Sequence, residues 1–132
     1  MNTIEMMTAK TLIDIGVNPG LSGYDYLCTA IPLAYKDKTY IRQITKKLYP
    51  EIAERYSSNT SRVERAIRHA IESTFLNTDI DVLKKYFGNV VNCMSGKVTN
   101  TTFIATVTEH IRMQLEADGV DREVESHDQP IV

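Results

Sequence analysis

The apolar residues along the chain recur at intervals of three and four, and no segment alternates apolar and polar residues over six positions between turn signals. This pattern predicts an all-α fold, a compact bundle of six or seven helices. The expected helices span residues 3–15, 24–35, 39–48, 50–56, 61–75, 79–87 and 100–115. The pattern leaves open whether 39–48 and 50–56 are two helices or one bent helix, and it predicts a loop over 89–98.

Several residues mark the expected ends of these helices. Gly16 and Gly88 follow apolar stripes and suit the left-handed cap of a helix end. Pro32 lies inside the second helix, which it should kink or end early. The spacing of Ser61 and Glu64 is that of a capping box and predicts a helix beginning at Ser61.

The helices at 50–56 and 61–75, separated by a polar break, have the form of a helix-turn-helix. Ala53 is the expected small contact between them, and Ile52 and Tyr56 are the expected inner face of the first helix. The break has no glycine, so Asn59 is expected to adopt the left-handed conformation in its place.

At about 100° per residue, the helix 61–75 separates into two faces. Val63, Ala66, Ile67, Ala70 and Thr74 share the apolar face. The opposite face and its flanks supply the predicted DNA-binding residues, which are Ser61, Arg62, Glu64, Arg65, Arg68 and His69. An arginine here can donate to guanine and a glutamate can accept from cytosine. The alternative is a solvated helix face with a Glu64 to Arg68 ion pair.

Charge is unevenly distributed along the 132 residues. The net charge is −2, but residues 116–132 carry −5 and residues 1–115 carry +3. The length favours one domain. We therefore expect a helical DNA-binding domain at 1–115 and an acidic, disordered tail at 116–132.

The chain offers little for catalysis, and we expect no enzyme activity, no cofactor and no metal site. Its histidines, His69, His110 and His127, show no metal-ligand or triad spacing. Cys28 and Cys93 form no paired motif and are expected to be reduced thiols. No apolar run is long enough for a membrane span and no signal peptide is evident, so we expect a cytoplasmic protein.

The run from Ser61 to Glu72 resembles the recognition helix in the effector domain of the stage zero sporulation protein A family. Shorter collinear matches extend the resemblance over about residues 10–115, among them Gly23-Tyr24-x-Tyr26-Leu27 and Lys85-Tyr86-Phe87-Gly88-Asn89. The resemblance implies a transcription activator or repressor of endospore-forming bacteria that binds double-stranded promoter DNA as tandem copies.

The same resemblance implies that Arg62, Glu64, Arg65, Arg68 and His69 face DNA, with Ser61 at the helix start. It also implies a contact of about residues 79–88 with the sigma subunit of RNA polymerase. The family's receiver domain has no counterpart before residue 10, which leaves either an excised domain or a stand-alone effector. The alternative function is a helical protein-interaction module, or an anti-regulator that has lost DNA affinity.

Overall fold

All regular structure is helical in residues 1–88 and 98–119, the part of the chain that the computed structural model describes. The expectation of an all-α bundle of six or seven helices is confirmed. Seven α-helices and one π-helical segment form in the described residues: α1 (Thr3–Ile15), α2 (Ser22–Lys36), α3 (Thr39–Arg42), η1 (Ile44–Leu48), α4 (Tyr49–Arg55), α5 (Thr60–Asn77), α6 (Ile80–Phe87) and α8 (Asn100–Ala117). None of these helices is long and apolar enough to cross a membrane.

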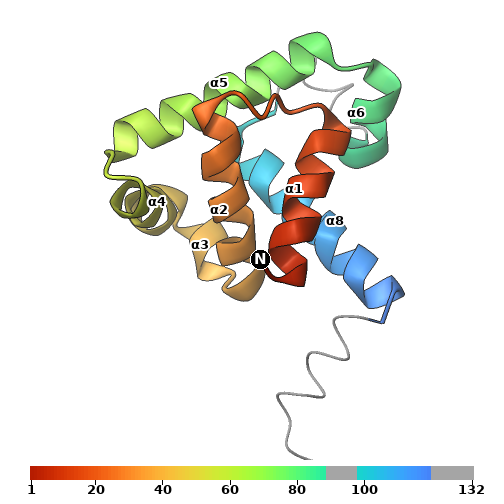
Figure 1. The fold of residues 1–132 in the computed structure, drawn as a ribbon, viewed down its shortest axis with the longest axis horizontal. Coiled ribbons are helices and arrows are strands. Elements are labelled where there is room, and N and C mark those ends of the chain that lie inside the picture. Colours follow the sequence, from red (N-terminus) through yellow and green to blue (C-terminus); the bar gives the residue numbers. More distant parts are fainter. Residues whose placement is uncertain (89–97, 120–132) are drawn as a thin grey trace, which may run out of the picture.

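Helix α2 lies at the centre of the bundle, in contact with α1, α5 and α8 (Figure 1). Helix α5 runs across one side of the molecule, and α8 passes behind α1 and α2. The largest fully buried side chains come from all of these helices and include Leu12, Leu27, Ile31, Ile67, Phe103 and Ile104. One continuous core therefore fixes the position of α5.

The approach of α2 to α5 depends on Gly23. A Cβ atom at this position would lie 2.2 Å from the carbonyl oxygen of Ala66 and 2.7 Å from the Cβ of Ala70. Such distances are far below van der Waals contact, so only glycine lets the two helix backbones come this close.

The first two helices confirm part of the expected boundaries. Helix α1 spans the predicted residues and ends at Gly16, which has the left-handed φ of 106°. Asn2 and Glu5 form a capping box at its start, which was not predicted from the sequence. Of the two effects expected of Pro32, a kink or an early end, the early end does not occur, because α2 continues to Lys36. Pro32 is buried, and the only backbone bond that it removes is the one to the Cys28 carbonyl.

The open question about residues 39–56 is resolved by a break at Gln43. Gln43 has φ −128° and ψ 54°, outside the helical region, so α3 ends before it. From Ile44 to Arg55 the chain is continuous, first as the π-helical η1 and then as α4. The break thus lies at Gln43, before the expected junction between Leu48 and Pro50.

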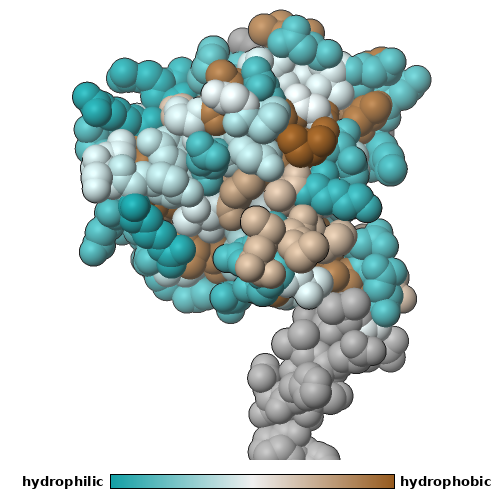
Figure 2. Space-filling model, viewed as in Figure 1, coloured by the Kyte–Doolittle hydropathy of each residue, from teal (hydrophilic) through white to brown (hydrophobic). Residues whose placement is uncertain are grey.

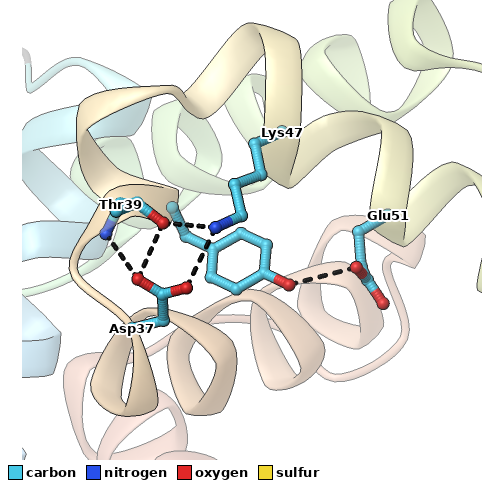
Figure 3. Close-up of polar contacts among 5 residues, drawn as sticks. Asp37, Thr39, Lys47 and Glu51 are labelled. Atoms are coloured by element: carbon cyan, nitrogen blue, oxygen red, sulfur yellow. Dashed lines mark hydrogen bonds and ion pairs between the residues drawn. The ribbon is translucent and has the colours of Figure 1, made fainter.

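A polar network holds η1 against the end of α2 (Figure 3). The Lys47 ammonium donates to Asp37 Oδ2 at 2.9 Å and to Thr39 Oγ1, and it lies 4.5 Å from the centre of the Tyr40 ring. Hydrogen bonds from Thr39 and Lys47 lower the pKa of Asp37 to about 2. The Lys47 ammonium therefore has its partners within the protein itself.

The end of the described chain departs slightly from expectation. Helix α8 continues to Ala117, so the first two residues of the expected tail are helical. Residues 120–132 of the acidic tail and residues 89–97 of the loop predicted over 89–98 lie outside the described residues, and with them Cys93 and His127. Cys28 is a free thiol.

Candidate nucleic-acid interface

The connection between α4 and α5 is a tight turn centred on Ser57. Ser57 has a positive φ of 53°, the Ser58 amide donates to the Ala53 carbonyl at 2.8 Å, and the Ser57 amide donates to the Glu54 carbonyl at 3.4 Å. This is the Schellman arrangement that usually contains glycine. The expectation that Asn59 takes the left-handed role is wrong, because its φ is −137° and Ser57 takes that role.

The start of α5 also differs from the prediction. The helix begins at Thr60, and the side chain of Asn59 accepts a hydrogen bond of 2.9 Å from the Arg62 amide. Ser61 is already inside the first turn, so the predicted capping box of Ser61 and Glu64 does not form. Asn59 is an equally good cap, and the position of the Ser57 turn decides between the two.

The first helix of the pair packs as expected except at its end. Ile52 and Ala53 are buried, whereas Tyr56 is 42% exposed and is not part of an inner face. Its hydroxyl donates to the Asp25 carbonyl at 3.2 Å, and its ring contacts Tyr26 edge-on. Tyr56 therefore connects the end of α4 to α2, close to the turn that sets the direction of α5.

The predicted division of α5 into two faces is confirmed. Val63, Ile67, Ala70 and Thr74 are buried and Ala66 is half-buried. The exposed side chains of the opposite face are Ser61, Arg62, Arg65, Arg68, His69 and Glu72. Figure 2 shows mostly hydrophilic and near-neutral side chains over the region of α4 and the adjoining end of α5, with strongly hydrophobic residues confined to small separate patches.

The four basic side chains on this face differ in their partners. Arg68 Nε donates to Glu64 Oε2 at 3.0 Å and Arg68 Nη2 approaches Glu64 Oε1 at 3.4 Å. The hydrogen bond with Glu64 raises the pKa of Arg68. Within the described residues, Arg62, Arg65 and His69 make no ion pair. Arg62 and Arg65 are thus free to pair with anionic groups from outside.

Glu64, at the edge of the exposed face, lies at a junction of three helices. Asn100 at the start of α8 places its amide nitrogen 3.2 Å from the Glu64 backbone carbonyl and 3.5 Å from Glu64 Oε2. The same nitrogen lies 3.0 Å from the hydroxyl of Tyr49 in α4. We call Tyr49, Glu64 and Asn100 the three-helix junction.

The structure therefore brings all six predicted residues to one helix, with Glu64 turned toward this junction. Asn100 and Tyr49 were not among the residues predicted from the sequence. No local pattern could have indicated them, because Asn100 lies 36 residues from Glu64 and 51 from Tyr49.

Nothing in the described part of the chain resembles a metal centre, since no three His, Cys, Asp or Glu side chains lie together there. His69 is exposed on α5. His110 packs against Tyr86 with ring centres 4.7 Å apart, and burial lowers the pKa of this imidazole. These two histidines lie on different helices, α5 and α8.

A helical bundle that exposes a cation-rich helix face beside a short turn is typical of DNA-binding regulatory domains. A comparison with protein families agrees with this class. The family model described as "Sporulation initiation factor Spo0A C terminal" matches residues 8–111, which is more than half of the chain. The chain belongs to this family.

Family membership confirms the resemblance to the effector domain of a sporulation regulator. It supports a DNA-binding domain that regulates transcription in sporulation, rather than a member of an enzyme family. The matched region includes the whole of α5 and the three-helix junction, and it ends before the acidic segment.

Proposed function

We propose that this protein is a sequence-specific DNA-binding transcription regulator that inserts the first half of α5 into the major groove of promoter DNA. In this proposal α4, the Ser57 turn and α5 act as a helix-turn-helix. The main support is that Arg62 and Arg65 are exposed and lack ion-pair partners among the described residues. Both lie opposite the buried face of the same helix.

The proposed contacts follow from the chemistry of each side chain. Arg62 and Arg65 can each donate two hydrogen bonds to guanine O6 and N7. Ser61 and His69 can donate to phosphate oxygens beside the groove. Glu64 can accept from the amino group of cytosine, and Arg68 can exchange its Glu64 partner for a phosphate. All six residues therefore have a role in the proposed interface.

The proposal is tested by selecting bound duplexes from a random DNA pool and measuring affinity against salt concentration. We expect a defined binding motif and a steep negative slope of log affinity against log salt, because phosphate contacts release counterions. A slope near zero, with no selected motif, would overturn the proposal and favour the helical protein-interaction module.

A matched pair of variants separates sequence recognition from charge. Replacing both Arg62 and Arg65 with alanine removes two positive charges from α5, and replacing both Lys84 and Lys85 removes two from α6. We expect only the α5 variant to lose the selected motif. Equal loss in both variants would mean that DNA is attracted by overall charge alone.

Assembly on DNA is a separate part of the proposal. One recognition helix reads few base pairs, so we propose that two copies occupy adjacent sites while the free protein is monomeric. The region expected to join them, residues 92–115, lies partly outside the described residues. Sedimentation of the free protein and titration onto one-site and two-site duplexes test this; a stable dimer without DNA would contradict it.

The remaining proposals concern boundaries and a protein partner. We propose that residues 1–115 form the DNA-binding domain and that the acidic segment from 116 onward lies outside it.

Contact of α6 with the sigma subunit of RNA polymerase also remains a prediction. Charge-reversing Lys84 and Lys85 should then lower transcription activation without changing DNA affinity, whereas unchanged activation would remove α6 from that role.

A further inference from the structure

The three-helix junction lies behind the part of α5 that we propose reads DNA. Asn100 links the exposed face to the core, because it contacts Glu64, whose carboxylate in turn accepts hydrogen bonds from Arg68. An amide group has two hydrogens, and three acceptors lie within 3.5 Å of this nitrogen. The two shorter distances, to the Tyr49 hydroxyl and the Glu64 backbone carbonyl, are the bonds that it makes best.

These two bonds join both helices of the proposed helix-turn-helix to α8. Tyr49 is the first residue of α4 and is buried, while Glu64 is in the second turn of α5. Burial raises the pKa of Tyr49, so its hydroxyl stays neutral and can accept from Asn100. The junction therefore fixes the reading half of α5 relative to α4 at one point outside the Ser57 turn.

We propose that Asn100 is a positioning residue for DNA recognition: it sets the orientation of the first half of α5 and the placement of Glu64 and Arg68. This inference rests on the proposed function of α5. Asn100 itself is partly buried behind the exposed face, and no role as a direct DNA contact is assigned to it. Recognition thus depends on a residue that lies in another helix, 36 positions from Glu64 along the chain.

The test replaces Asn100 with alanine in the full chain. Thr99 caps α8 through its own side chain, so this change leaves the cap in place. The ratio of affinities for the selected and a scrambled duplex should fall about tenfold, which is the effect of misplacing one base contact. The salt slope should stay unchanged, because the phosphate-binding cations remain.

Two control variants distinguish positioning from other effects. Asn77→Ala removes a comparable amide, which donates to the Ser73 carbonyl at 2.8 Å, from the far end of α5. It should leave the affinity ratio unchanged. Ile104→Val removes one buried methylene from α8 and lowers stability without touching the junction. It should also keep the ratio, measured well below its melting temperature.

A second measurement needs no DNA. In NMR spectra of the free protein, Asn100→Ala should shift the Arg68 Nε–H signal, because that group donates to Glu64. A full-length protein that shows no sequence preference would refute the proposed function, whereas the Arg68 signal would still report on the junction. The positioning role would be overturned if Asn100→Ala left the Arg68 signal or the affinity ratio unchanged. It would also be overturned if Ile104→Val lowered the affinity ratio as much as Asn100→Ala does.

Discussion

The two faces of α5 are built from the same eighteen-residue helix but obey different constraints. On the buried face, Val63, Ile67 and Ala70 have no exposed surface and pack against α2 and α8. On the other face, Arg62 and Arg65 are exposed and make no ion pair within the described chain. The fold determines the first face, whereas on the second face it leaves Arg62 and Arg65 without ion-pair partners.

This difference shows why residue type alone does not reveal function. Lys47 is also basic and also close to α4, yet it is bound to Asp37 and Thr39 and stacked on Tyr40. A cation with such partners stabilises a connection between helices. A cation without partners on a rigid helix is available to a ligand at no cost in lost internal bonds.

The largest effect should come from damaging the buried face. Ile67→Ala deletes atoms that are completely buried, so it should lower the free energy of unfolding by about 2–5 kcal/mol. Leu76→Ala on the same helix is the control; its side chain is 84% exposed, and the change should stay within about 0.5 kcal/mol. Urea denaturation measures both, and similar values for the two would mean that α5 does not contribute to the core.

The next effect concerns the distance between α5 and α2. Gly23→Ala would place a methyl group 2.2 Å from the Ala66 carbonyl oxygen, which should cost about 1–3 kcal/mol of stability. The higher helix propensity of alanine offsets at most about 1 kcal/mol. Thermal melting beside the exposed neighbour variant Ser22→Ala measures the difference. A more stable Gly23→Ala protein would show that the two helices are not in close contact.

Much of the fold could be predicted from periodicity, because a stripe of apolar residues at helical spacing has few other ways to be buried. The end marked by Gly16 was also predictable, because glycine readily adopts the left-handed conformation that caps the helix there. The start of α5 could not be predicted from the sequence. Asn59 and Ser61 are both good caps, and only the turn at Ser57, set by packing of α4, selects Asn59.

The candidate site shows the same limit. The exposed face of α5 followed from spacing, and so did the ion pair between Glu64 and Arg68, which lie four residues apart on the helix. Arg65 has no acidic residue three or four positions away, and it makes no ion pair in the described structure. The position of Glu64 depends on Asn100 in another helix, so it could be found only from the folded structure.

On the exposed face, Arg62→Ala or Arg65→Ala should weaken binding to the selected duplex by about 1–3 kcal/mol and relax the preference at a guanine-bearing position. Stability should be unaffected because neither side chain has an ion-pair partner in the described structure. Affinities for duplexes with single substitutions measure this, beside melting curves. Uniform weakening on all sequences would assign that arginine to phosphates, and no change would contradict insertion of α5 in the groove.

The smallest effect should come from Glu64, at the boundary between the two faces. Because the capping box does not form, Glu64→Ala should not disturb the start of α5, which Asn59 caps. The ion pair that it removes is exposed, with 51% of the Arg68 side chain and 39% of the Glu64 side chain accessible, so the melting temperature should change little.

DNA binding by Glu64→Ala should change in a characteristic way. Asn100 keeps its bond to the backbone carbonyl of residue 64, so α5 should retain its orientation. Arg68 loses its partner and a negative charge near the phosphates disappears, so affinity for a scrambled duplex should rise while the preference at one position is lost. Melting curves and affinities for the selected and scrambled duplexes measure both effects. A clearly destabilised variant with unaltered preference would place Glu64 in the packing of the buried face instead.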